Sequence, residues 1–260
     1  MLVDIIVVVL KKTLEAGILI SVILSIGGYY KFGVSWVFKA LMAGLAGGIL
    51  WALNLDYLSG MFEEVGQEVI GASMQIVIYF LLVMICVARC NESAKRLRYL
   101  PWILGAAIAV VFVLKGGELA VFYFGFLNNE AGILNAVIYG FIGLSVGISA
   151  SAVCFYALAE FSSVHIRKAH IIVLCFIAGG MALQATQLLV QADWLPTYEP
   201  IWDSNWLLSE SSVAGQITHA AFGYEATPSL LDFIVYINSI LILLGFVLLG
   251  NKDIFIFDNQ

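Results

Sequence analysis

Seven long apolar stretches constrain this chain more than any other feature of its sequence. Each is long enough to cross a bilayer as an α-helix, which takes about 20 residues. They lie at 3–28, 34–55, 66–88, 102–127, 133–158, 169–192 and 228–249. The chain is 62% hydrophobic and 12% charged, whereas soluble domains are nearer half apolar and a quarter charged. We therefore expect an all-α polytopic membrane protein with seven transmembrane helices, embedded in a lipid bilayer.

The charges in the connections between these stretches separate by sign. One set of connections is basic, with Lys31, Arg89, Lys95, Arg96, Arg98, Arg167, Lys168 and Lys252. The other set holds only acidic charges, at Asp4, Asp56, Glu63, Glu64, Glu68, Glu130, Asp193, Glu199, Asp203, Glu210 and Glu225. Lys and Arg accumulate on the cytoplasmic side of membrane proteins. We predict a multi-pass protein of the plasma (bacterial inner) membrane, with its N-terminus outside and its C-terminus in the cytoplasm.

A charged tetrad is repeated inside two of the apolar stretches. Lys12-Thr13-Leu14-Glu15 stands in the first stretch and Lys115-Gly116-Gly117-Glu118 in the fourth, 103 residues apart (115 − 12 = 103). An ionisable side chain at the bilayer centre costs roughly 2.5–3.5 kcal/mol on insertion scales, so such residues indicate a functional site. We interpret Lys12, Glu15, Lys115 and Glu118 as the centre of that site.

The repeated tetrad indicates an internal duplication of three helices. The second stretches of the two halves also share a glycine-rich patch, at Gly44–Gly48 and Gly143–Gly147. A three-helix unit repeated in this way has inverted topology, as in many transporters. We predict a 3+3 inverted repeat with one added helix: 1–98 and 99–192 are the repeats, 193–227 is an extracytoplasmic loop, and 228–260 is the seventh helix with a cytoplasmic tail.

Inversion has an electrostatic consequence for the two tetrads. If the two helices cross antiparallel, Lys12 approaches Glu118 and Glu15 approaches Lys115, which closes a ring of four alternating charges. Buried ions persist when they are paired and hydrogen-bonded. Lys11 lies about 100° round the helix from Lys12. Its ammonium must therefore find another partner, extend to the membrane interface, or lose its proton.

At these residues the sequence resembles the oxidase-dependent (Ftr-type) iron permeases of bacteria and fungi. That family has seven spans, inverted halves, and an Arg-Glu-Gly-x-Glu motif in spans one and four. The last glutamate of each motif is present here as Glu15 and Glu118, whereas Lys12 and Lys115 replace the first glutamates. The family's arginine corresponds to Lys11 and to Leu114. The resemblance implies an iron permease that would be a divergent member of this family.

A second stretch carries the same resemblance. Leu207 to Gln216, then Gly223-Tyr224, Pro228-Ser229 and Asp232, are similar to the segment that leads into the family's last helix. The lysine replacements change the chemistry of the centre. Iron favours carboxylate oxygen, and two lysines with two glutamates supply about half the ligands of four glutamates and no net charge.

The first hypothesis is therefore a permease that moves iron or another small ion through the crossing of the first and fourth helices. Glu15 and Glu118 are the candidate metal ligands. Asp232 is a candidate outer carboxylate. Gln184, Gln187 and Gln191 share one helix face and either line a polar path or make interhelical hydrogen bonds. We expect no tightly bound cofactor, with iron as a transported ion only.

Two alternatives remain open. The chain could be a non-transporting accessory or structural subunit of a larger membrane complex, with the charged ring as an inert clamp. The outer loop 193–227, which holds Trp194, Trp202 and Trp206, would then dock other membrane subunits. In the permease hypothesis, the same loop would dock an extracytoplasmic oxidase or iron-delivery protein; otherwise its tryptophans belong to the headgroup belt. Transport of a proton or an anion through the Lys–Glu pairs is the third hypothesis.

Other classes of function have little support. No basic cluster is long enough to follow nucleic-acid phosphates, and no nucleotide-binding or hydrolase motif is present, so we expect neither nucleic acid nor enzymatic activity. We interpret the four cysteines, Cys86, Cys90, Cys154 and Cys175, as small core residues. We expect His165 and His170 on the cytoplasmic surface and His219 in a solvated outer loop.

Overall fold

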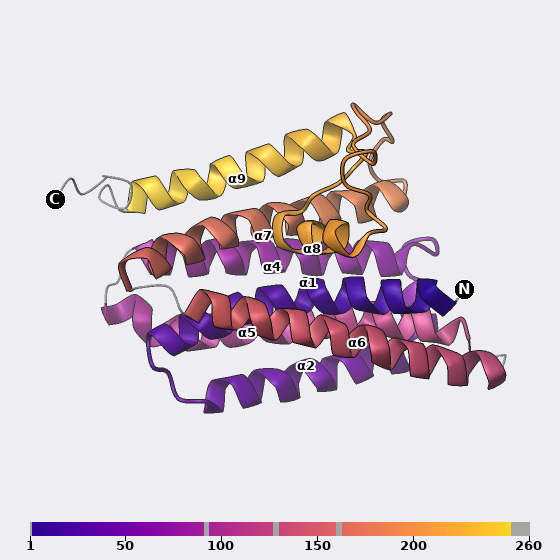
Figure 1. Cartoon of the computed structure of the whole chain (residues 1–260), viewed down its shortest axis with the longest axis horizontal. Coiled ribbons are helices and arrows are strands. Elements are labelled where there is room, and N and C mark those ends of the chain that lie inside the picture. Colours follow the sequence, from indigo (N-terminus) through magenta and orange to yellow (C-terminus); the bar gives the residue numbers. More distant parts are fainter. Residues whose placement is uncertain (1, 91–93, 127–129, 160–162, 251–260) are drawn as a thin grey trace.

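The computed structural model describes residues 2–90, 94–126, 130–159 and 163–250, which form a bundle of helices lying side by side (Figure 1). The helices are α1 (Leu2–Tyr29), α2 (Ser35–Leu53), α3 (Leu55–Ser59), α4 (Gly66–Cys90), α5 (Ala94–Phe124), α6 (Glu130–Ala159), α7 (Ser163–Gln191), α8 (Val213–Phe222) and α9 (Leu230–Gly250). The all-helical prediction is confirmed for this part of the chain.

Six of these helices are long and apolar enough to cross a membrane: Ser35–Leu53, Gly66–Cys90, Arg98–Phe124, Gly132–Ala159, Lys168–Gln191 and Leu230–Leu248. The 28-residue α1 is not among the six; it carries the charges Asp4, Lys11, Lys12 and Glu15. Each of the seven long helices nevertheless coincides with a predicted stretch. The largest difference is α5, which begins at Ala94 instead of 102 and therefore runs across the predicted boundary between 98 and 99.

The bundle has a buried centre and a lipid-facing exterior. The centre is built from α1, α4, α5 and α7, whose side chains such as Leu19, Ile78, Leu104 and Leu174 are fully buried. The helices α2, α6 and α9 lie on the outside and expose many large apolar side chains. An apolar surface of this extent is unfavourable in water. The multi-pass membrane assignment explains it, because the outer helices then contact acyl chains.

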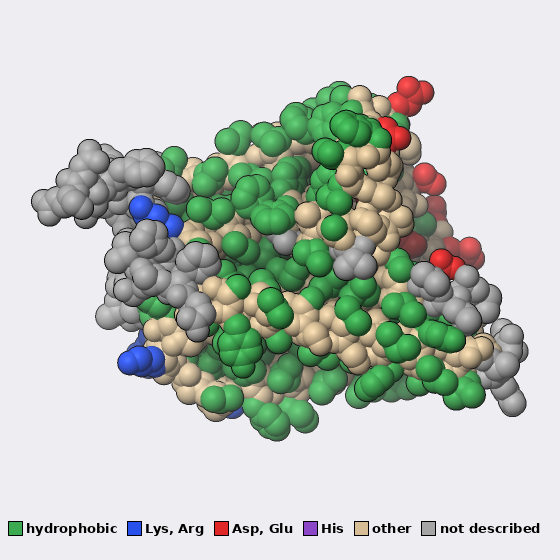
Figure 2. Space-filling view, in the orientation of Figure 1, with side chains coloured by type: hydrophobic (Ala, Val, Ile, Leu, Met, Phe, Trp, Pro, Cys, Tyr) green, Lys and Arg blue, Asp and Glu red, His purple; other side chains and the backbone are tan. Residues whose placement is uncertain are grey.

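Charged side chains gather at the two ends of the bundle. Acidic groups lie at the end where α1 begins, and basic groups lie at the opposite end, with a largely apolar surface between them (Figure 2). This is the separation of charge that we expected from the basic and acidic connections between the apolar stretches. The side chains of Lys95, Arg96, Glu130, His165, Arg167 and Lys252, and the predicted tail 251–260, lie outside the described part of the structure.

Two residues assigned to the cytoplasmic surface are fully buried instead, and those two predictions were wrong. Arg89 lies inside α4 and donates through Nη1 to the Tyr30 hydroxyl at 2.9 Å, with its guanidinium 4.4 Å from the ring centroid of Tyr29. Nη2 of Arg89 lies 3.2 Å from Nδ1 of His170, whose Nε2 lies 2.9 Å from the Ser25 hydroxyl. Because α4 and α7 extend further than predicted, both residues face neighbouring helices and not a loop.

Candidate functional site

The two tetrads meet where α1 and α5 cross. Lys12 lies ten residues after the start of α1 at Leu2, and Lys115 lies nine residues before the end of α5 at Phe124. At 1.5 Å per residue, both positions are about 14–15 Å from the same end of the bundle. That is half the thickness of a bilayer's hydrocarbon core, which is about 30 Å.

The predicted pairings across this crossing are confirmed. Nζ of Lys12 lies 2.7 Å from Oε2 of Glu118, and Nζ of Lys115 lies 2.6 Å from Oε2 of Glu15. Nζ of Lys115 is also 3.3 Å from both carboxylate oxygens of Glu118. The contacts therefore link the four side chains in the alternating order Lys12, Glu118, Lys115, Glu15.

Burial divides the four charges into two pairs. The exposed fractions of Glu15 and Lys115 are 2% and 6%, whereas those of Lys12 and Glu118 are 29% and 21%. We call Lys115–Glu15 the inner pair and Lys12–Glu118 the rim pair. The inner pair is almost completely buried, and the rim pair is partly exposed.

Two glutamines complete the surroundings of the inner pair. Oε1 of Gln184 on α7 accepts from Nζ of Lys115 at 3.3 Å and from Nε2 of Gln75 on α4 at 2.8 Å. The ammonium of Lys115 thus contacts oxygens from three helices. Oε1 of Gln75 is buried and has no hydrogen-bond donor among the described residues, so this carbonyl is available to a ligand.

The segment predicted as an outer loop contributes a residue to the site through α8. Ser212 caps the first turn by accepting from the Gly215 amide, and Gly223 ends the helix with a φ of 65°, a left-handed conformation that glycine adopts readily. This short helix packs against α1 and α7. It buries His219, whose Nε2 lies 3.5 Å from Oε1 of Glu15 and whose Nδ1 lies 2.8 Å from the carbonyl oxygen of Tyr224. The expectation of a solvated His219 was wrong.

A polar cavity of about 200 Å³ lies against the rim pair. Its lining residues are Lys11, Lys12, Glu15, Gln75, Glu118, Gln184, Gln187, Leu188, Gln191 and His219. The three glutamines predicted to share a face of the sixth span therefore border one space. Gln187 extends the polar surface outward, because its Nε2 donates to Oε2 of Glu225 at 2.5 Å.

Asp232 takes a different position from the other predicted site residues. It lies in the first turn of α9, where its Oδ2 accepts from the amide of Ser229 at 3.0 Å and from the Ser229 hydroxyl at 2.7 Å. These bonds cap the helix. Asp232 borders a second cavity of about 300 Å³, together with Glu225 and Trp202. Burial raises the pKa of Glu225 to about 7, and the nearby charges of Asp232 and Glu210 add to this rise.

No preformed metal centre is visible in the described ranges, where no three His, Cys, Asp or Glu side chains gather closely enough to hold an ion. Cys86, Cys90 and Cys175 are buried, Cys154 is half-buried, and none of the four forms a disulfide. Glu15 and Glu118, the predicted metal ligands, both contact the ammonium of Lys115.

Sequence reasoning missed Gln75 and the burial of His219. Gln75 is a single glutamine in an apolar span and carries no motif. His219 follows the segment Leu207 to Gln216, whose resemblance identified the stretch but gave no indication of a helix that folds back onto α1. Two capping signals for this helix were available in the sequence. Ser212 is followed by Gly215 three residues later at the start of the helix, and Gly223 follows its last residue.

Comparison with known proteins relates the chain to transporters. The ferrous iron permease EfeU of Escherichia coli O6:K15:H31 (strain 536 / UPEC) is 23% identical over 274 residues, which cover 93% of this chain and 94% of the permease. EfeU of Shigella sonnei (strain Ss046) is 22% identical over 261 residues, with 88% and 89% covered.

No family model and no solved structure matches the chain. The relatives are named as permeases, which are transporters and not enzymes, in agreement with the non-enzyme prediction. The similarity extends over nearly the whole of both chains and supports a distant relation to the ferrous iron permeases.

Proposed function

We propose that this chain is a permease for iron ions, with its translocation site at the crossing of α1 and α5. The observation that carries the proposal is the convergence of Glu15 and Glu118, from two helices, on one buried position occupied by a positive charge. Carboxylate oxygens suit hard and borderline cations. The distant similarity to ferrous iron permeases supports iron as the ion.

Lys115 occupies the position where we expect the transported cation to bind. Its ammonium contacts oxygens of Glu15, Glu118 and Gln184 at 2.6–3.3 Å, a set of ligands that would equally suit a metal ion. Two unit charges 4 Å apart repel by about 4 kcal/mol at an effective dielectric constant of 20. An incoming iron ion therefore binds only when Lys115 has moved aside, and Lys115 replaces the ion when it leaves.

The polar cavity supplies the route to this position from the acidic end of the bundle. Gln187 and Gln191 line it, and Gln187 connects it to Glu225. Carboxylates at a channel mouth raise the local concentration of cations. Lys11 and Lys12 oppose them inside the cavity, so we expect slow and selective conduction and not an open pore.

The packing of the two halves supports the proposed inverted repeat. A methyl group added at Gly44 of α2 would lie 2.6 Å from Cβ of Phe112 on α5, and one added at Gly143 of α6 would lie 3.3 Å from Cβ of Val9 on α1. Gly44 and Gly143 begin the two glycine-rich patches, and Phe112 and Val9 are 103 residues apart (112 − 9 = 103), like the tetrads. The second helix of each half therefore packs against the first helix of the other half, as a two-fold axis requires.

We further propose that α1 is the seventh span and that the N-terminus lies outside. The helix runs parallel to the six apolar helices and its charges are paired inside the bundle (Figure 1). The basic end of the bundle would face the cytoplasm. On this assignment 1–98 and 99–192 approximate the two repeats, and the loop 193–227 lies outside, where an oxidase or iron-delivery protein would dock.

Uptake of radiolabelled Fe²⁺ into proteoliposomes tests the proposal. We expect Glu15→Gln and Glu118→Gln each to reduce uptake at least tenfold, because each removes a carboxylate from the cation position. The control variant is Glu63→Gln, an exposed carboxylate away from the cavity, which should transport normally. Uptake by the wild-type protein that is no faster than in the Glu15→Gln/Glu118→Gln variant would exclude iron transport.

One observation favours a second candidate function, that of a non-transporting subunit. The Lys12–Glu118 and Lys115–Glu15 pairs neutralise one another without any bound ion, so the crossing could be a purely structural clamp. Exposed Trp194, Trp202 and Trp206 would then form a docking surface on the outer loop. Mild solubilisation followed by affinity purification discriminates the two: a stoichiometric membrane partner supports the subunit, and a partner-free protein with Fe²⁺ uptake supports the permease.

A further inference from the structure

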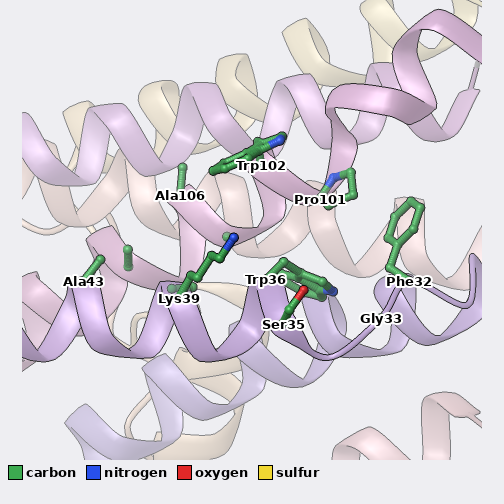
Figure 3. A pocket seen from close by; sticks show the side chains of 12 residues that line it. Phe32, Gly33, Ser35, Trp36, Lys39, Ala43, Pro101, Trp102 and Ala106 are labelled. Atoms are coloured by element: carbon green, nitrogen blue, oxygen red, sulfur yellow. The ribbon is translucent and has the colours of Figure 1, made fainter.

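We propose that the groove between α2 and α5 at the basic end of the bundle binds an anionic phospholipid. The groove has a volume of about 500 Å³ and is separate from the polar cavity. Its walls include Trp36, Lys39 and Ala40 of α2 and Trp102, Gly105 and Ala106 of α5. In Figure 3, Lys39 extends from α2 toward Trp102 on the facing helix.

The groove is open because small residues line it on both helices. A methyl group added at Gly105 would lie 3.7 Å from Cβ of Ala40 and 3.8 Å from Cε3 of Trp36, which is ordinary van der Waals contact. Deeper in the bundle the same two helices touch, since a methyl group at Gly44 would lie 2.6 Å from Cβ of Phe112. The result is a trough that narrows toward the bilayer centre, a shape that accepts an acyl chain.

The mouth of the groove is electropositive. Lys39 is exposed, and its ammonium lies 5.7 Å from the ring centroid of Trp102. Lys31 and Arg98 are exposed at the same end of the bundle, and α2 begins without an acidic residue in its first turn or a side-chain cap. None of the described residues that line the groove is acidic. A phosphate group at Lys39 would therefore meet no acidic side chain among these lining residues.

The surroundings identify a lipid as the occupant. Phe38, Met42 and Leu45 beside the groove are exposed apolar residues on a membrane-facing helix, so a ligand must arrive from the bilayer. Trp36 and Trp102 have the position of an interfacial aromatic belt, and basic pockets between helices on the cytoplasmic side bind anionic headgroups. The acyl chains of a zwitterionic lipid would fit the trough, but its headgroup carries no net negative charge to pair with Lys39. A second protein copy would neither fit the narrow trough nor pair with the lysine.

Measuring lipid binding to the purified protein by native mass spectrometry tests this inference. The probes are phosphatidylglycerol and phosphatidylcholine with identical acyl chains. We expect the wild-type protein to bind phosphatidylglycerol more tightly, and Lys39→Gln to reduce this preference about fivefold, the loss expected for one lysine near an anionic headgroup. Lys168→Gln, the same change at the basic end of the bundle but on α7, which does not line the groove, should leave the preference unchanged.

A steric variant tests the trough independently of charge. Ala106→Leu should fill the groove and weaken binding of both lipids, whereas Ala152→Leu on the exposed face of α6 should not. Equal wild-type affinities for the two lipids, or unchanged binding in Lys39→Gln or Ala106→Leu, would overturn the proposal. A wild-type dimer that carries no lipid would overturn it as well, in favour of a second copy in the groove.

Discussion

The inner pair and the rim pair are built from the same repeated tetrad, yet they are physically different. In α1 the glutamate is buried and the lysine is partly exposed, whereas in α5 the lysine is buried and the glutamate is partly exposed. Lys115–Glu15 is therefore an ion pair inside protein, and Lys12–Glu118 is an ion pair beside polar space. Two copies of one sequence motif have acquired opposite exposures.

The neighbouring helices explain this asymmetry. α8 packs beside α1 and brings His219 to Glu15, which removes that carboxylate from solvent. Gln184 of α7, itself hydrogen-bonded to Gln75 of α4, contacts the ammonium of Lys115. The proposed backbone symmetry therefore does not give equal burial of the two tetrads, because α8 lies outside the proposed repeats and packs beside α1. The inner pair should control stability, and the rim pair should control access.

Breaking the inner pair should have the largest effect on stability. Glu15→Gln keeps the shape of the side chain but removes the carboxylate that lies 2.6 Å from Nζ of Lys115. Removing one partner of a buried pair typically costs about 3–5 kcal/mol, because the remaining charge is left buried. We expect a loss of that size in the free energy of unfolding, measured by SDS titration of the purified protein.

Removing both partners of the inner pair provides the control for that experiment. The variant Glu15→Gln/Lys115→Met leaves no uncompensated charge at this position and should regain most of the lost stability. A Glu15→Gln variant within 1 kcal/mol of the wild type would show that Lys115 is adequately held by Glu118 alone. The division into inner and rim pairs would then fail.

Replacing Lys115 alone tests whether it stands in for a cation. Lys115→Met leaves the carboxylates of Glu15 and Glu118 facing the space that the ammonium fills in the wild type. Mn²⁺, an air-stable substitute for Fe²⁺, should therefore raise the thermal midpoint of this variant, since a ligand at 100 times its Kd stabilises a protein by about 2.7 kcal/mol. Lys12→Met, which leaves the inner pair intact, should not respond. An equal response of wild type and Lys115→Met would exclude the tethered-cation role.

The positions of the long helices and the cross-pairing of the tetrads followed from the sequence, because apolar length and a 103-residue repeat are both visible in it. The asymmetry of the pairs did not follow, since it depends on α8, a ten-residue helix that packs against α1 and α7. Arg89 and His170 were misassigned for a related reason: charge near a helix end suggested a loop, whereas the rings of Tyr29 and Tyr30 cover the guanidinium. Local sequence does not record which distant side chains provide such cover.

The outer part of the site should respond to pH. The pKa of Glu225 is raised from 4.5 to about 7, chiefly by burial, so the folded state favours its protonated form. The stability that this group contributes is present in full below pH 4.5 and is lost as pH rises through 7. We expect the thermal midpoint of the wild type to fall between pH 5 and pH 7.5, and Glu225→Gln to reduce that fall. Glu199→Gln, an exposed control, should behave like the wild type.

The smallest effect is expected at the rim pair. Lys12→Met breaks a 2.7 Å contact with Glu118, but both side chains face the cavity and Glu118 keeps Lys115 as a partner. Partly exposed pairs contribute about 0.2–1 kcal/mol, so the free energy of unfolding should fall by no more than that in the same SDS titration. Lys12→Arg should match the wild type. A loss in Lys12→Met as large as in Glu15→Gln would mean that the four charges act as one symmetric unit, and the exposures of the two pairs would then carry no functional distinction.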